Sequence, residues 1–214
     1  MTKKWKAMSN PDKAKHVILY LIGVAIMPLG VVLTINAHLG SGGYDALNFA
    51  IAEKLGINTS IAIYSTAFLV LILTAVIRRG FPRIRTFISS FLLGFFTDVW
   101  KFALAGVEGT TVASSAVIMV VGLIVISFAV ACYIISIFPT NPTDDLIVAL
   151  NEKGWKIRWA KIALDVTCVV LALILGGEIG MGTIICTFGL GPAIDVFHKL
   201  VTKACKFQPE RVDS

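Results

Sequence analysis

The chain is dominated by long apolar stretches separated by short polar segments. A helix needs about 20 apolar residues to cross a bilayer, and six windows approach that length. They cover residues 17–36, 60–77, 86–105, 111–138, 157–175 and 182–200. The first window is longer than the apolar region of a secretory signal peptide, which has about 7–15 residues. The pattern therefore predicts an all-α integral membrane protein with six transmembrane helices, the first of which is retained.

Two shorter segments, residues 44–54 and 143–153, follow the first and the fourth apolar window. Each would extend about 16 Å as a helix, at 1.5 Å per residue. They are too short and too polar to cross a membrane. The sequence predicts that each forms a half-helix, and it leaves open whether the half-helices re-enter the membrane or lie at its surface.

Aligning the chain with itself reveals an internal repeat. Asp45 aligns with Asp144 at an offset of 99 residues, and Asp98 aligns with Asp195 at an offset of 97. Each copy contains three predicted spans, an odd number, so the second copy has to enter the membrane from the opposite side. Inverted repeats of this kind recur in transporters, with the substrate near the midplane. The alternative is that duplication built a stable bundle without a role in transport.

The composition excludes a soluble enzyme domain. Hydrophobic residues make up 57% of the chain and charged residues 15%, against about 25% charged in soluble domains. With the N-terminus inside, seventeen of the nineteen basic residues fall on cytoplasmic segments, as membrane proteins prefer. The net charge of +6 is thereby explained by topology, with the anionic inner leaflet of the lipid bilayer as a sufficient partner and no nucleic acid required.

These observations divide the chain into four parts. Residues 1–16 are a basic cytoplasmic segment, and residues 17–105 form the first three-helix repeat. Residues 111–200 form the second, inverted repeat, and residues 201–214 are a cytoplasmic tail. Both termini are expected in the cytoplasm.

The loops that precede the two half-helices are the candidate substrate-binding segments. Both lead into a helix N-terminus, where free backbone N–H groups favour polar and anionic ligands. The candidate residues are Gly40, Ser41, Gly42, Gly43, Tyr44, Asp45, Thr140, Asn141, Thr143 and Asp144. A simpler alternative is that Asp45 and Asp144 only stabilise the first helical turns, as acidic residues commonly do.

Three further aspartates fall inside predicted spans, where carboxylates are costly and should face protein or a cavity. Asp98 and Asp195 are assigned a structural or ion-coupling role, with the N–H groups of the half-helix loops as their expected partners. Asp165 has no acidic counterpart in the first repeat. It follows Lys161 by one turn, which predicts an intrahelical ion pair.

The sequence gives no sign of an enzyme. The four cysteines show no CxxC spacing, and the three histidines are scattered, so no metal site is indicated. The chain also lacks the common metalloprotease, ATPase and serine-hydrolase motifs. We expect no catalytic residues, no metal and no cofactor.

Three short motifs resemble the YczE/YyaS/YitT group of bacterial integral membrane proteins. Residues 39–47 resemble the group's Leu-Gly-x-x-Pro-Trp-Asp-x-Leu pattern, with Gly43 and Tyr44 in place of Pro and Trp. Residues 141–146 look like its Gly-Pro-Arg-Asp-Gly-Leu element, with Thr143 in place of Arg. Gly182-Thr183 and Gly191-Pro192 look like its closing Gly-Thr and Gly-Pro pattern.

The resemblance implies a multi-pass protein of the bacterial cytoplasmic membrane, of the permease kind and without an established activity. The missing Arg at residue 143 counts against an anionic substrate. The sequence favours a permease for a small polar solute over a non-transporting accessory or regulatory protein that acts through a partner. Substrate, coupling ion and oligomeric state stay open.

Overall fold

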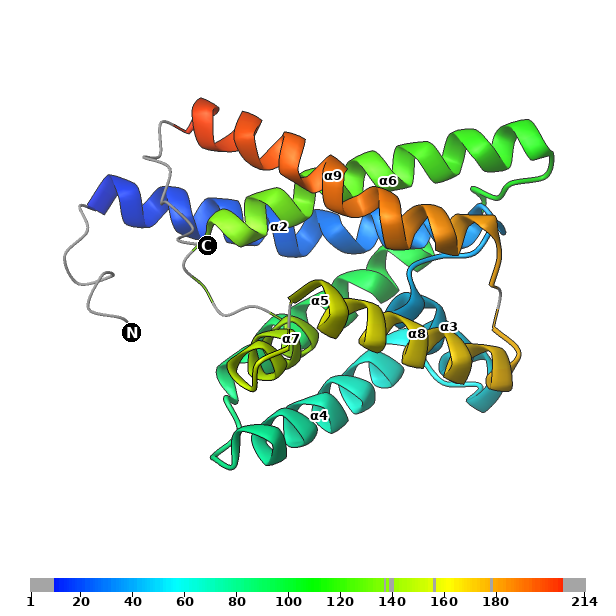
Figure 1. The fold of residues 1–214 in the computed structure, drawn as a ribbon. Coiled ribbons are helices and arrows are strands. Elements are labelled where there is room, and N and C mark those ends of the chain that lie inside the picture. The colour runs from blue at the N-terminus through cyan, green and yellow to red at the C-terminus, as the bar shows by residue number, and fades with distance from the viewer. Residues whose placement is uncertain (1–9, 137, 139–140, 156, 178, 206–214) are drawn as a thin grey trace.

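The structure, a computed structural model, describes residues 10–136, 138, 141–155, 157–177 and 179–205. Every regular element in this part of the chain is an α-helix (Figure 1). The helices are α2 (Asn10–Asn36), α3 (Gly43–Leu55), α4 (Thr59–Arg78), α5 (Arg85–Ala103), α6 (Val112–Ile135), α7 (Pro142–Glu152), α8 (Ile157–Leu175) and α9 (Met181–Ala204).

Each of the six apolar windows coincides with a helix, and each predicted half-helix is present as α3 or α7. Within the described residues, four helices, α2, α4, α6 and α9, are long and apolar enough to cross a membrane. The remaining long helices, α5 and α8, have 19 residues each. Both contain charged side chains, such as Lys101 in α5 and Asp165 in α8.

Local sequence explains where the half-helices begin and end. Pro142 is the first residue of α7, where a missing N–H costs nothing and its fixed φ suits the helix. Gly56 ends α3 in the left-handed conformation, with φ at 63°, and its N–H closes the last turn. The half-helices are thus defined by their own terminal residues.

The long helices α2 and α6 lie side by side and make the most extensive contact in the molecule (Figure 1). Glycines allow this close approach. A Cβ atom added at Gly30 would lie 2.8 Å from the carbonyl oxygen of Gly122, and one at Gly122 would lie 2.9 Å from that of Gly30. Small residues at such crossings are typical of membrane helix pairs, because van der Waals packing drives their association.

The two half-helices pack across the molecule, α3 against α8 and α7 against α4. The start of α3 meets the middle of α8, where a Cβ atom at Gly43 would lie 2.7 Å from the carbonyl oxygen of Asp165. Further along, Ala46 and Leu47 of α3 pack with Cys168 and Ala172 of α8. The half-helix α3 therefore begins deep inside the bundle.

The last helix departs from the arrangement of its counterpart. In the first half of the chain α5 packs against both α2 and α4, whereas α9 packs against α6 and has no comparable contact with α8. Figure 1 shows α9 above, beside α6, and α8 in the lower layer. As a result only 11% of the apolar window of α9 is buried, against 50% for α2.

Candidate functional site

The loop between α2 and α3 is clamped against the start of α9. The backbone N–H of Gly182 donates to the carbonyl oxygen of Leu39 at 2.6 Å. Gly40 has a φ of +92°, and a Cβ atom there would lie 2.5 Å from both the Gly180 nitrogen and the Thr183 hydroxyl oxygen. No other residue type fits at Gly40 without moving the loop or α9.

Ser41, the next residue in this loop, is fully buried. Its hydroxyl has no hydrogen-bond partner within the described part of the chain. Buried hydroxyl groups are normally paired, since leaving one unpaired costs about 1–3 kcal/mol. Ser41 is therefore a polar group held without a partner at the start of a half-helix.

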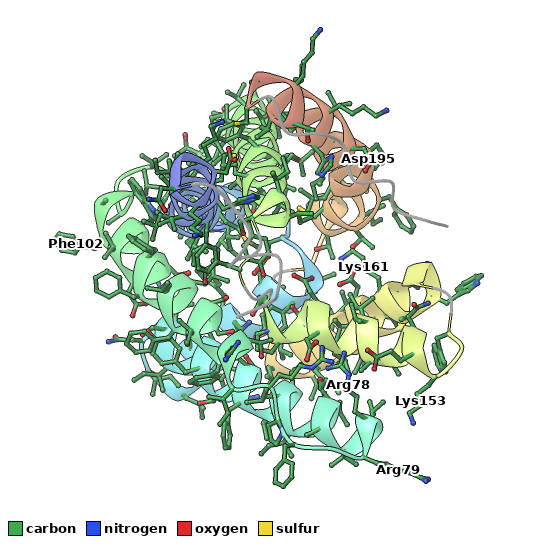
Figure 2. The ribbon with its side chains drawn as sticks, turned by 90° about the vertical axis from the view of Figure 1, so that its left-hand side faces the viewer. Arg78, Arg79, Phe102, Lys153, Lys161 and Asp195 are labelled. Atoms are coloured by element: carbon green, nitrogen blue, oxygen red, sulfur yellow. The ribbon has the colours of Figure 1, made fainter. Side chains whose placement is uncertain are left out.

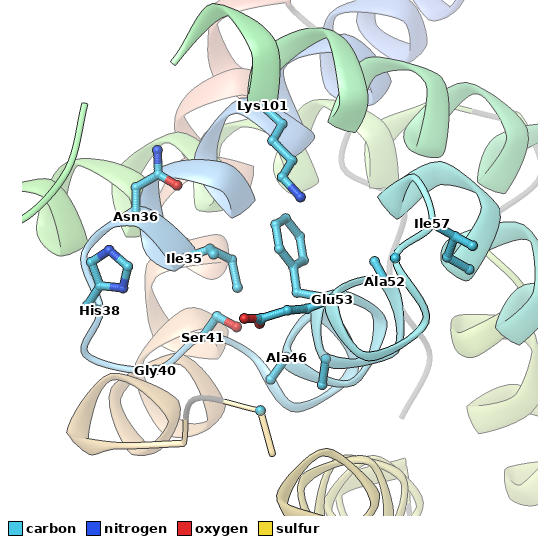
Figure 3. A pocket seen from close by; sticks show the side chains of 14 residues that line it. Ile35, Asn36, His38, Gly40, Ser41, Ala46, Ala52, Glu53, Ile57 and Lys101 are labelled. Atoms are coloured by element: carbon cyan, nitrogen blue, oxygen red, sulfur yellow. The ribbon is translucent and has the colours of Figure 1, made fainter. Parts of the chain in front are cut away.

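Ser41 lines a cavity of about 470 Å³ between the ends of α2 and α5, the half-helix α3 and Gly177 (Figure 3). The volume is within the range of small-molecule sites. The other polar side chains around it include Asn36, Glu53 and Lys101, and Phe49 supplies an aromatic face. Two of the predicted substrate-binding residues, Gly40 and Ser41, thus border a real cavity.

Lys101 and Glu53 place opposite charges on this cavity. The Lys101 Nζ donates to the Thr59 hydroxyl at 3.2 Å and lies 5.3 Å from the centre of the Phe49 ring. Both charged side chains line the cavity, yet no ion pair joins them among the described residues. In Figure 3 Lys101 points into the cavity from α5, while Glu53 and Ser41 approach from the α3 side.

Tyr44 faces away from the cavity and holds α3 to α4. Its hydroxyl lies 3.0 Å from the Thr66 hydroxyl, which in turn donates to the Asn48 Oδ1 at 2.6 Å. Asn48 also donates to the Tyr44 carbonyl oxygen at 2.8 Å. These bonds account for the polar groups of Tyr44, so the structure gives it an anchoring position.

Asp45 starts α3 beside an ion pair on α8. The predicted pair of Lys161 and Asp165 is present, with 3.3 Å between Nζ and Oδ2. Asp45 interacts electrostatically with both members of that pair, yet its carboxylate forms no hydrogen bond or ion pair within the described residues. Gly42, which precedes the helix, offers no side-chain cap.

The second loop is closed by polar contacts. Asn141 donates its backbone N–H to the Tyr133 hydroxyl and accepts a hydrogen bond from Ser90 at 2.7 Å. The Tyr133 hydroxyl also donates to the Asp144 carboxylate at 3.5 Å. Thr143 is buried, whereas the predicted Thr140 lies outside the described residues. The described part of this loop is tied to α5 and α6.

The paired aspartates of the long helices lie in different surroundings. Asp98 accepts a hydrogen bond from the backbone N–H of Ser60 at 3.2 Å. Our expectation of a half-helix loop as its partner was wrong, because α5 packs against α4 and brings Asp98 to the first turn of that helix. Asp195 is exposed on α9, and no hydrogen bond or ion pair is present for it among the described residues.

A charge cluster that the sequence analysis missed joins α4 to α7. Arg78 binds Asp145 at 2.6 Å and Glu152 at 2.8 Å, and Arg83 binds Asp145 at 3.1 Å. The hydrogen bond from Arg78 lowers the pKa of the Glu152 carboxyl from its usual value. The matching acidic position at Glu53 and Glu152 in the two repeats was the signal available.

No three His, Cys, Asp or Glu side chains among the described residues are grouped so that they could hold a metal ion. The polar side chains that line the cavity are those of Ser41, His38, Glu53, Lys101 and Asn36, and Phe49 adds an aromatic face. The amide nitrogen of Asn36 already donates to the carbonyl oxygens of Leu104 and Val107. Such a set suits binding of a small polar molecule.

Comparison with known proteins places the chain in a family. A family of unknown function, DUF6198, matches residues 14–199. The chain belongs to this family. No solved structure gives a significant match to the chain.

The relatives of this DUF6198 chain include proteins of Bacillus subtilis and Haemophilus influenzae. It is similar to the "Uncharacterized membrane protein YczE" of Bacillus subtilis (strain 168), with 28% identity over 168 residues, 78% of this chain and 77% of that protein. The "Uncharacterized protein YyaS" of the same strain is 27% identical over 186 residues, which cover 86% of this chain and 92% of that protein. An "Uncharacterized protein" of Haemophilus influenzae (strain ATCC 51907 / DSM 11121 / KW20 / Rd) is 22% identical over 192 residues, covering 88% and 86%.

The resemblance to the YczE and YyaS group is thereby confirmed. One of these relatives is described as a membrane protein, in agreement with the four apolar helices of span length. The chain is accordingly an all-helical membrane protein of the DUF6198 family.

Proposed function

We propose that this protein is a secondary permease that carries a small polar solute across the bacterial cytoplasmic membrane. The observation that carries the proposal is the cavity alongside α3, whose lining includes Ser41, a residue with a buried and unpaired hydroxyl. Many transporters bind their substrates at the interface between two repeats, beside discontinuous helices. The residues assigned to binding in this cavity are Gly40 and Ser41.

The proposal includes six spans in two inverted repeats, residues 17–105 and 111–200. The reciprocal packing of the half-helices supports this arrangement: α3 of the first repeat packs on α8 of the second, and α7 of the second packs on α4 of the first. Exchanging the repeats exchanges these two pairs. The central contact of α2 with α6 joins equivalent helices in the same way.

The proposed orientation puts both termini and the ends of α4 and α7 in the cytoplasm. The concentration of basic residues on these segments supports it. The cavity, which lies at the ends of α2 and α5, then opens toward the outer face. Figure 2 views the opposite end, with Arg78, Arg79 and Lys153 labelled there.

Repeat alignment relates the cavity to the Arg78 cluster. Asp145 and Glu152, which bind Arg78, align at an offset of 99 residues with Ala46 and Glu53, which line the cavity. The same position is therefore filled by ion pairs on the proposed cytoplasmic side and open on the outer side. This difference supports a conformation of the permease that is open to the outside.

The proposal is tested by a thermal-shift screen of the purified protein against carboxylates, amines, amino acids, nucleobases and sugars. A ligand at 100 times its Kd stabilises a protein by about 2.7 kcal/mol. We expect one chemical class to raise Tm, and the rise to disappear in Ser41→Ala. No response from any class, or a response that Ser41→Ala leaves intact, would contradict the proposed site and favour a protein that acts through a partner.

A further inference from the structure

We infer that the cavity beside Ser41 binds a small zwitterion, a molecule that carries one ammonium and one carboxylate group, such as a short amino acid. The inference rests on the proposed function and assigns a solute class to the same site. Lys101 is the partner for the carboxylate and Glu53 is the partner for the ammonium group, and Ser41 is a further polar residue of the same cavity lining.

Two opposite charges share this cavity and are not paired with each other within the described residues. Lys101 and Glu53 both line it, and no ion pair joins them among the described residues. In the second repeat the carboxylate equivalent to Glu53 is Glu152, and it is bound by Arg78 at 2.8 Å. Glu53 holds the same helical position without such a protein partner in the described part of the chain.

The Lys101 side chain is held in position before any ligand binds. Its ammonium group donates to the Thr59 hydroxyl at 3.2 Å and lies 5.3 Å from the Phe49 ring centre. An ammonium group has three donors, so two remain for a ligand. A lysine held in place before binding loses less conformational entropy when a carboxylate arrives.

Ser41 also lines the cavity, and its fully buried hydroxyl has no hydrogen-bond partner within the described residues. It can donate to a carboxylate or accept from an ammonium group. A ligand that bonds to it removes the cost of leaving it unpaired. The cavity of about 470 Å³ is also large compared with the roughly 30 Å³ that one water occupies in the liquid, so a small organic molecule fits.

A ligand with a single charge fits this set less well. A simple amine gives Lys101 no carboxylate and brings a second cation close to it. A simple carboxylate gives Glu53 no ammonium group and brings a second anion close to it. A zwitterion matches both charges and adds no net charge to the cavity. The charge arrangement therefore favours a zwitterion over a ligand that carries only an ammonium group or only a carboxylate.

The test compares β-alanine, glycine and 4-aminobutyrate with propionate, propylamine and an equimolar mixture of the last two. Binding to the purified full-length protein is measured by thermal shift and by calorimetry. We expect at least one zwitterion to bind, and the single-charge compounds and their mixture to bind about tenfold more weakly or not at all. Equal binding of the mixture and the zwitterions would overturn the inference.

Charge variants assign the two partners. Glu53→Gln and Lys101→Gln are each expected to weaken zwitterion binding about tenfold or more. Lys54→Gln is the matched control, because Lys54 is exposed next to Glu53 and does not line the cavity. Equal effects of Glu53→Gln and Lys54→Gln would overturn the assignment. The melting temperature without ligand shows that each variant is folded, and Glu53→Asp provides a second variant that keeps the charge.

The outcomes separate this inference from the proposed function. Stabilisation by a sugar or a nucleobase that depends on Ser41 would overturn the zwitterion and leave a permease for another solute. Zwitterion binding that follows the charge variants, without movement of the solute across a membrane, would overturn the permease and leave the ligand class in place.

Discussion

The carboxylate of Asp98 accepts a hydrogen bond from the backbone N–H of Ser60 at 3.2 Å and so caps the first turn of α4. Its repeat counterpart Asp195 is exposed on α9, which packs against α6 and not closely against α8. Two aspartates that align in the sequence thus do different things. Asp98 joins α5 to α4 within the first repeat, whereas Asp195 makes no equivalent contact between helices among the described residues.

This contrast predicts unequal effects on stability. Asp98→Ala is expected to lower the free energy of unfolding by about 0.5–2 kcal/mol, because it removes the acceptor at a helix N-terminus. Asp195→Ala is expected to change it by less than about 0.5 kcal/mol, as for most exposed substitutions. Unfolding of both variants in the same detergent checks this. Equal losses for the two would show that Asp195 also has a structural partner.

Ser41 and Ser90 are both fully buried. The Ser90 hydroxyl donates a hydrogen bond to Asn141, whereas the Ser41 hydroxyl has no hydrogen-bond partner within the described residues. Ser90→Ala leaves the Asn141 Oδ1 without its 2.7 Å hydrogen bond, so we expect a loss of about 1–3 kcal/mol. Ser41→Ala removes a hydroxyl that is unpaired in the absence of ligand, and stability without ligand should stay the same or rise. Unfolding measurements on the two variants test this difference.

A drop in stability for Ser41→Ala as large as that for Ser90→Ala would contradict the description of Ser41. It would mean that the Ser41 hydroxyl stabilises the protein when no solute is bound. The loss of ligand response in this variant could then be a consequence of misfolding.

The contact between Arg78 and Glu152 predicts a dependence of stability on pH. Because Arg78 lowers the pKa of Glu152 below its ordinary value of 4.5, the contact stabilises the folded state above that pH. The contribution disappears as the pH falls through the lowered pKa. The melting temperature of Glu152→Gln should therefore be lower than that of the wild type at pH 7, and the difference between the two melting temperatures should disappear in more acidic buffer.

The control for this prediction is Glu53→Gln, which changes the aligned carboxylate of the other repeat. No ion pair is present for Glu53 among the described residues. The melting temperature of Glu53→Gln should therefore stay close to that of the wild type, and the difference should not depend on pH as it does for Glu152→Gln. A gap for Glu152→Gln that is constant from pH 7 into the acidic range would contradict a role for its charge.

Some of this arrangement followed from the sequence, and some did not. The half-helices were predictable, because apolar windows and the repeat fix where a short polar segment interrupts the spans. The partner of Asp98 was not, because it depends on how α5 packs against α4. The cavity was only half predictable. Gly40 and Ser41 precede the half-helix, but Lys101 reaches it from the end of α5, a placement that no local pattern encodes.

The inverted topology predicts that the loop before α6 and the end of α7 face opposite sides of the membrane. Single cysteines at Glu108→Cys and Asn151→Cys, in a variant without the four native cysteines, can be labelled in intact cells with a membrane-impermeant maleimide. We expect labelling of residue 108 from outside and of residue 151 only after the membrane is opened. Labelling of both from the same side would exclude two inverted three-span repeats.

The most direct test of the permease is solute uptake by counterflow. Proteoliposomes loaded with the unlabelled ligand found by thermal shift are diluted into a trace of the same radiolabelled compound. A carrier predicts transient accumulation of label in vesicles that contain the wild type, and none in those with Ser41→Ala or in empty vesicles. A ligand that binds with the expected dependence on Ser41 but never enters the vesicles would contradict the permease and leave a solute-binding membrane protein.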